Sequence, residues 1–147
     1  MPPSMSFPAL TFSSGILGTI QSLEGISRCT ALGFKKGFYE DLILVDSASN
    51  KFHVIGAKKI SNLPLRFKVG DLLGLLAGNR RWLVEPIFDS STVRLSIEDV
   101  KQLIRRCFAD EDDYWEEMGD FEVFRDKIWA ATSIGEIFAI FREFHVM

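Results

Sequence analysis

Two short apolar runs separated by a mostly polar segment constrain the fold of this chain more than any other feature. Residues 42–45 read LILV and residues 52–55 read FHVI, whereas residues 46–51 read DSASNK. Asp and Asn side chains hydrogen-bond to nearby backbone groups, which favours a turn between two strands. We therefore expect an antiparallel hairpin over residues 41–60. A hairpin is not stable alone in water, so other strands and helices must pack against it.

Length and composition predict one domain, spanning residues 1–147, with a core of its own. The chain has 147 residues, of which 47% are hydrophobic, and this is enough to bury a sizeable core. Thirteen Phe and three Trp predict either a core of aromatic rings or a surface that needs a partner. Residues 1–8 contain three prolines, and we expect them to form a loose tail of a mature N-terminus without a secretory signal.

Three further segments of the first half have weaker patterns. Residues 12–26 place Ile and Leu at helical spacing but also contain glycines and β-branched residues, which leaves a short helix and a strand both open. Residues 29–38 read as a turn that leads into the hairpin. The Leu-rich segment 69–77 is followed by Gly-Asn, a helix stop, and predicts a short buried helix.

Residues 81–88, RWLVEPIF, predict another strand. Because Pro86 cannot donate a ladder hydrogen bond, this strand should be an edge strand or be bulged at that residue. Residues 89–91 then read as a turn, after which residues 93–95 extend the sheet.

The last third of the chain is helical in pattern. Ser96 with Asp99, and Ser133 with Glu136, form capping boxes that start two helices. Each of these two helices has one apolar stripe, and a third stripe between them predicts a third helix. The first stripe is Ile97, Val100, Leu103, Ile104, Cys107 and Phe108. The middle stripe is Phe121, Phe124, Ile128 and Ala131, and the last is Ile134, Ile137, Phe138, Phe141 and Phe144. The predicted fold class is α+β, with a small antiparallel sheet in the N-terminal half packed by C-terminal helices.

We find no catalytic motif, metal-ligand pattern or cofactor-binding signature, and we predict a protein that is not an enzyme. The two histidines, His53 and His145, have no nucleophile motif beside them. Cys29 and Cys107 are far apart and read as reduced, buried thiols, with a disulfide as the alternative. Residues 110–113 are acidic but lack the Gly and terminal Glu of a calcium loop.

Charge is unevenly distributed along the chain. Residues 110–126 hold nine acidic residues and one basic residue, Arg125, so this segment has a net charge of −8. Because the whole chain has a net charge of −3, the rest of the chain carries +5. Such a run reads either as a solvated helix face or as a docking surface for a basic protein, in which aromatic residues are the anchors. The predicted partner-binding residues are Asp110, Glu111, Asp112, Asp113, Tyr114, Trp115, Glu116, Glu117, Asp120 and Glu122.

Basic residues recur as four pairs: Lys35-Lys36, Lys58-Lys59, Arg80-Arg81 and Arg105-Arg106. These pairs would contact phosphate only if the fold brought them together. Their spacing in the sequence does not show that, so we do not expect nucleic acid to be the partner.

Three segments resemble the immunity proteins of bacterial toxin–immunity pairs, such as those of contact-dependent inhibition and polymorphic toxin systems. These segments are LILVDSASNKFHVIGAKKI, LSIEDVKQLI and EVFRDKIWAATSIGEIFAIF. The resemblance implies a small cytosolic inhibitor that binds a toxin domain, commonly a nuclease, and covers its active site. These families share no catalytic motif, so no site residue is carried over.

The sequence therefore predicts a cytoplasmic, non-enzymatic binding protein, with a basic toxin domain as its partner and no membrane span. Two alternatives remain open. One is a small enzyme that uses His53 or a pair of carboxylates, and the other is a structural or regulatory domain that associates with copies of itself.

Overall fold

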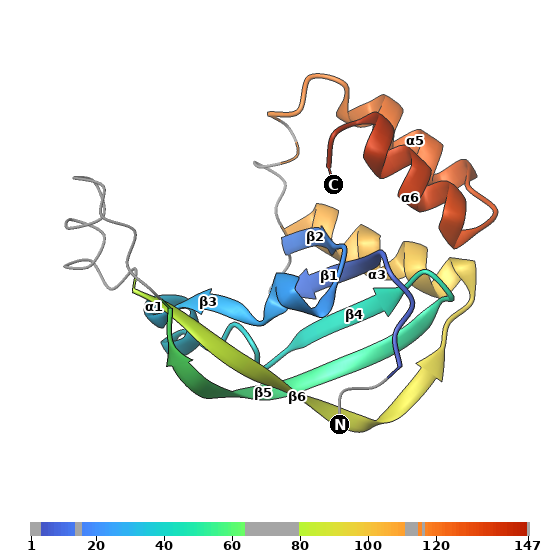
Figure 1. Cartoon of the computed structure of the whole chain (residues 1–147). Coiled ribbons are helices and arrows are strands. Elements are labelled where there is room, and N and C mark those ends of the chain that lie inside the picture. The colour runs from blue at the N-terminus through green and yellow to red at the C-terminus, as the bar shows by residue number, and fades with distance from the viewer. Residues whose placement is uncertain (1–3, 14–15, 64–79, 111–114, 116, 147) are drawn as a thin grey trace.

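The computed structural model describes residues 4–13, 16–63, 80–110, 115 and 117–146. Six strands form one sheet in the order β2-β1-β4-β5-β6-β3, in which every pairing is antiparallel. The strands are β1 (Ala9–Ser13), β2 (Ile16–Ile20), β3 (Arg28–Thr30), β4 (Leu42–Asp46), β5 (Asn50–Asn62) and β6 (Arg81–Arg94). The helices are η1 (Leu23–Ile26), α1 (Ala31–Lys35), α3 (Ile97–Asp110), α5 (Phe121–Ala130) and α6 (Ile134–Glu143). The α+β class is confirmed, and the C-terminal helices pack on the sheet (Figure 1).

The predicted hairpin is formed by β4 and β5, with Leu42 opposite Val54 and Val45 opposite Lys51. Asp46 closes the turn as expected, because its Oδ1 accepts hydrogen bonds from the backbone amides of Ala48 and Asn50 at 3.0 and 2.8 Å. The sheet is buried on both faces of β4, which explains why its apolar run is continuous rather than alternating.

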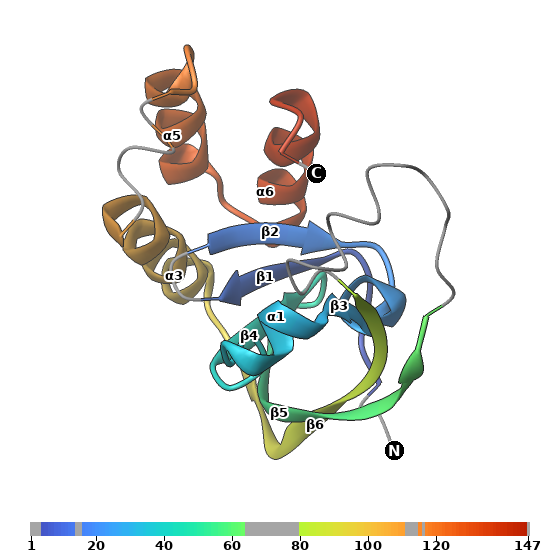
Figure 2. The ribbon, with the colours of Figure 1, turned by 90° about the vertical axis from the view of Figure 1, so that its left-hand side faces the viewer.

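The β5–β6 ribbon bends around one side of the molecule (Figure 2). Its register shifts at three places, and such bulges bend and twist a ribbon. In the first of these shifts, between Phe52 and Val54, residues 89–91 of β6 face His53 alone. The turn predicted over residues 89–91 is therefore a bulge inside one long strand, because the strand resumes its pairing with β5 at Thr92.

Two cores lie on opposite faces of the sheet. The inner core fills the curl of the sheet, and its buried members are Ala9, Ile20, Ile26, Tyr39, Leu42, Leu44, Phe52, Val54 and Val84. The helical core lies between the other face of the sheet and the three long helices. Leu10, Phe12, Leu17 and Val45 are its buried sheet members, and the helices supply both aliphatic and aromatic side chains.

The N-terminal segment differs from its prediction. Residues 12–26, for which helix and strand were both open, form the end of β1, then β2 and η1. Residues 4–8, expected as part of a loose tail, are attached to the hairpin turn, because the Ser6 amide donates to Asp46 Oδ2 at 3.0 Å and Met5 and Phe7 pack on the inner core. The helix predicted over residues 69–77 lies outside the described residues.

Pro86 lies where β6 has β5 as its one strand neighbour, because β3 pairs only with residues 81–83. The Val84 amide points towards the β3 side, where it donates to Ser27 O at 2.8 Å. Amide groups alternate along a strand, so the Pro86 nitrogen faces the same open side. The strand as a whole is not an edge strand, because β6 lies between β5 and β3, and it is not bulged at Pro86. Pro86 itself is at a local edge of the sheet, since β3 does not extend to it and no β5–β6 hydrogen bond is lost there.

The capping box at Ser96 is confirmed, whereas at Ser133 only the serine cap is confirmed. Ser96 Oγ accepts from the Asp99 amide at 3.2 Å, and Asp99 Oδ2 accepts from the Ser96 amide at 3.1 Å. At α6, Ser133 Oγ accepts from the Glu136 amide at 3.2 Å, but the Glu136 carboxylate reaches back to Thr132 rather than to Ser133.

Candidate protein-binding surface

The structure divides the predicted acidic site into three groups. Asp110 is the last residue of α3. Glu117, Asp120 and Glu122 are exposed on and just before α5. The remaining predicted carboxylates and Tyr114 lie outside the described residues; these are Glu111, Asp112, Asp113 and Glu116.

Trp115 does not lie on the surface, and its predicted role as an exposed anchor is wrong. Its side chain is only 3% exposed and belongs to the helical core. It stacks on Phe124 at 6.0 Å between ring centroids and meets the edge of Phe108 at 4.8 Å. The physical reason is that a large aromatic ring beside a charged run gains more from filling the gap between helices than from solvent.

The structure instead presents an apolar residue that the sequence analysis overlooked. Val123 is 53% exposed on α5, with Glu122 beside it and Asp126 one turn further on. Phe124 and Ile128, on the opposite face of the same helix, are fully buried. The sequence could have indicated this exposure, because Val123 falls outside the apolar stripe of its helix. We call Glu117, Asp120, Glu122, Val123 and Asp126 the acidic surface.

Most of the acidic surface forms no ion pair with the described part of the chain. Asp126 lies 3.5 Å from the Arg125 guanidinium, and both groups are in contact with water. Glu117, Asp120 and Glu122 form no ion pair with any described residue. Lys127 is engaged elsewhere, because its Nζ lies 2.6 Å from Glu143 Oε1 and links α5 to α6. Among the described residues, the surface therefore keeps a negative charge that no ion pair compensates, except at Asp126.

Part of this charge also has a role in the stability of α5. Asp120 is the N-cap residue, and Glu122 lies in the first turn. Carboxylates at that end interact favourably with the helix dipole. The Asp120 side chain makes no capping hydrogen bond, so its oxygens are available to a partner.

The structure also bears on the enzymatic alternative that used His53. This residue lies in β5 opposite the bulge of β6, where it is half-buried. Hydrogen bonds from the backbone amide and hydroxyl of Ser91 hold the pKa of the Asp89 carboxyl below its usual value, and nearby His53 acts in the same direction. Asp89 is fully exposed, so these residues meet at the surface rather than in a cavity.

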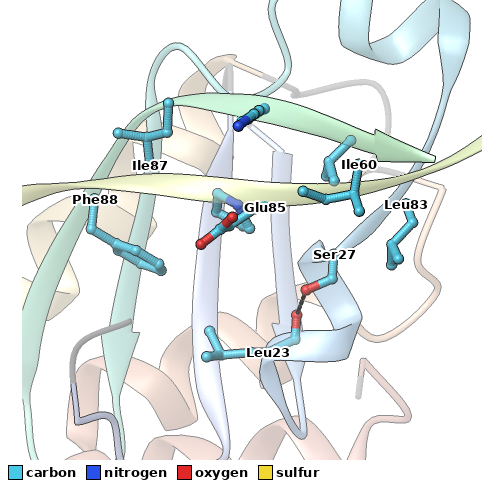
Figure 3. Close-up of a pocket in the computed structure, with 10 residues that line it drawn as sticks. Leu23, Ser27, Ile60, Leu83, Glu85, Ile87 and Phe88 are labelled. Carbon is cyan, nitrogen blue, oxygen red and sulfur yellow. Dashed lines mark hydrogen bonds between the residues drawn. The ribbon is translucent and has the colours of Figure 1, made fainter. Parts of the chain in front are cut away.

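One pocket, of about 610 Å³, opens beside the uncovered edge of β6 and does not include His53 (Figure 3). Apolar residues line most of it, including Leu23, Ile60 and Phe88. Its ionisable residues are Lys58 and Glu85, and Ser27 in its wall already donates to Leu23 O at 2.8 Å. This pocket therefore does not join His53 to a Cys, Asp or Glu, as the enzymatic alternative required.

The two cysteines are not joined in a disulfide. Cys29 lies beside Tyr39, whose hydroxyl donates to the Ile26 carbonyl. Burial raises the pKa of both groups, and contact with Cys29 raises that of Tyr39 further. Both groups are therefore neutral near pH 7, which fits a structural role. The described residues contain no group of three or more His, Cys, Asp or Glu that could hold a metal ion.

No protein-family model, curated protein or solved structure matches this chain. Among the helices of the described residues, none combines the length and the apolar character that crossing a membrane requires.

Proposed function

We propose that this chain is a non-enzymatic protein-binding domain that recognises a basic protein through its acidic surface. The observation that carries this proposal is that Glu117, Asp120 and Glu122 form no ion pair with any described residue and lie around the exposed Val123. Uncompensated charge around an apolar centre is the arrangement that steers a partner of opposite charge and then buries an anchor.

Packing behind α5 supports this proposal. Phe124 and Ile128 are fully buried on the inner side of the helix, and the Lys127–Glu143 ion pair links it to α6. Side chains on a well-packed helix are held close to one geometry, so a partner does not have to order them on binding.

The partner class follows from the resemblance to immunity proteins. We propose a toxin domain whose substrate-binding groups are basic, as the phosphate-binding groups of a nuclease are. The carboxylates of the acidic surface would occupy those groups, and the body of the domain would block access of the substrate. Under this proposal the protein acts in the cytoplasm of the cell that it protects.

The test is an affinity pull-down from lysate of the native host, followed by an inhibition assay with the purified partner. We expect one stoichiometric protein whose toxic activity is neutralised by this chain. Replacing Glu117 and Glu122 by Lys should weaken binding at least about tenfold at low salt, because both substitutions place like charges against the partner. Val123→Ala should cost more than about 1 kcal/mol of binding free energy if this residue is the anchor.

The matched control changes charge equally in the sheet half. Asp41→Lys with Glu85→Lys alters two exposed carboxylates away from α5 and should leave inhibition unchanged. Equal loss in both double variants would mean that only net charge matters. Full inhibition by the Glu117→Lys/Glu122→Lys variant, or recovery of nucleic acid without a protein, would overturn the proposal.

A further inference from the structure

Three of the four basic pairs come together at one end of the curled sheet, although up to 46 residues separate them in the sequence. The end of β5, the start of β6, β3 and α1 meet there (Figure 1). Arg81 pairs with Thr30, and the Ala31 amide donates to Arg80 O at 2.8 Å. Helix α1 follows directly, with Lys35 as its last residue and Lys36 as its C-cap. We call this the basic end; its cations are Arg28, Lys35, Lys36, Lys58, Lys59, Arg80 and Arg81.

These cations are exposed and are not neutralised by the described part of the chain. All three ion pairs among the described residues join side chains of α3, α5 and α6. Glu24, Glu40 and Glu85 lie on neighbouring segments, but none has a carboxylate oxygen within 4.0 Å of a cation of the basic end. This end of the molecule therefore presents an excess of positive charge on a chain whose overall charge is −3.

Aromatic rings lie directly under and beside these charges. Lys59 Nζ lies 4.1 Å from the ring centroid of Trp82, and Trp82 packs against Phe34 at 5.3 Å. Phe38, two residues after Lys36, is 39% exposed. An exposed ring beside lysines is what a base of a single strand stacks on.

Lysine content distinguishes between an acidic protein and a nucleic acid as the partner. Four of the seven cations are lysines, and protein–protein interfaces are depleted of lysine. Phosphate groups, in contrast, are bound by both Lys and Arg without any need for an apolar centre. We propose that the basic end binds the phosphate backbone of single-stranded nucleic acid, independently of base sequence and separately from the acidic surface.

Fluorescence anisotropy with labelled single-stranded DNA and RNA and with duplex DNA tests this inference on the full chain. We expect the single strands to bind more tightly than the duplex and the affinity to fall steeply between about 50 and 200 mM salt, as counterion release requires. Arg80→Glu with Arg81→Glu should lower the affinity at least about tenfold and reduce the salt dependence. The DNA and RNA probes show which sugar is preferred.

Arg94→Glu with Arg106→Glu is the matched control. It makes the same change in net charge at two exposed arginines outside the basic end and should leave the affinity within about twofold of the parent. Circular dichroism of both double variants establishes that they are folded. Absence of binding to every probe at low salt, equal losses in both folded variants, or salt-sensitive self-association in place of binding would overturn the inference.

Discussion

The two faces of the sheet carry cores that are built from different elements. In the helical core the aromatic rings of the helices contact one another, and Phe124 lies 6.0, 5.5 and 5.3 Å from Trp115, Phe141 and Phe144 between ring centroids. The inner core takes its buried residues from the strands, from η1 and from Tyr39, whose hydroxyl donates to a backbone carbonyl. The helical core joins strands near the start of the chain, through Leu10 and Phe12, to helices near its end, whereas the inner core lies within residues 5–88. The two cores therefore differ in which parts of the chain they hold together.

Truncating one large side chain in each core tests whether the cores unfold together. Phe124→Ala should lower the free energy of unfolding by about 3–5 kcal/mol, and Leu44→Ala by about 2–5 kcal/mol, because both side chains are fully buried and each change leaves a cavity. Urea unfolding, followed by tryptophan fluorescence and far-UV circular dichroism, measures both losses.

The positions of the tryptophans allow the fluorescence of the inner core to be separated from that of the helical core. Trp82 packs on the inner core, whereas Trp115 and Trp129 belong to the helical core. If the chain is one cooperative domain, a Trp82→Phe variant and a Trp115→Phe/Trp129→Phe variant should show coincident transitions by fluorescence and circular dichroism. Separate transitions would contradict the single domain predicted from chain length.

A smaller effect is expected at Asp46, which links the N-terminal segment to the hairpin. Its side chain is 1% exposed; Oδ1 accepts from the amides of Ala48 and Asn50, and Oδ2 accepts from the Ser6 amide. Asp46→Ala should cost about 2–4 kcal/mol of unfolding free energy, because buried donors lose a charged acceptor. Thermal or urea unfolding checks the value.

Asp46→Asn is the matched control for this residue. It keeps one oxygen for the turn amides and replaces the other with a donor that faces the Ser6 amide. We expect a smaller loss of stability together with faster hydrogen exchange at Ser6 than at Asn50. Equal exchange at both amides would show that the segment 4–8 is not held through this carboxylate.

The smallest effects are expected at the two capped helices of the helical core. Ser133→Ala and Ser96→Ala should each cost about 1 kcal/mol of unfolding free energy, because each removes a side-chain acceptor for a backbone amide at a helix start. A loss well below this value at either helix would mean that water replaces the serine oxygen.

Acid should weaken both caps in a predictable direction. Hydrogen bonds from Ser96 lower the pKa of Asp99, and hydrogen bonds from Thr132 lower that of Glu136. Since both values are lower in the folded state, the stabilisation is complete above the ordinary values of 3.8 and 4.5 and is lost as the pH falls through the folded values. Asp99→Asn with Glu136→Gln should make the free energy of unfolding depend less on pH in that range. An unchanged dependence on pH would contradict this assignment.

Features that depend on neighbours in the sequence were predicted well. The hairpin turn at Asp46, the serine caps of α3 and α6 and the local edge position of Pro86 each follow from the chemistry of one or a few nearby residues. Residues 12–26 were harder to predict, because β2 is defined by pairing with β1 rather than by its own propensity. Gly18 illustrates this, since a Cβ there would lie 2.8 Å from the Thr11 hydroxyl across the strand pair.

The sequence by itself determined the α+β class, the helix starts, the hairpin and the separation of charge along the chain, because periodicity, capping and turn chemistry act over a few residues. Tertiary structure decided the exposure of individual side chains. It placed Trp115 in the core and Val123 on the surface, and it brought Arg80 and Arg81 beside Lys35 and Lys36 through the pairing of β3 with β6. Burial and strand register depend on contacts between distant residues, which no local pattern encodes.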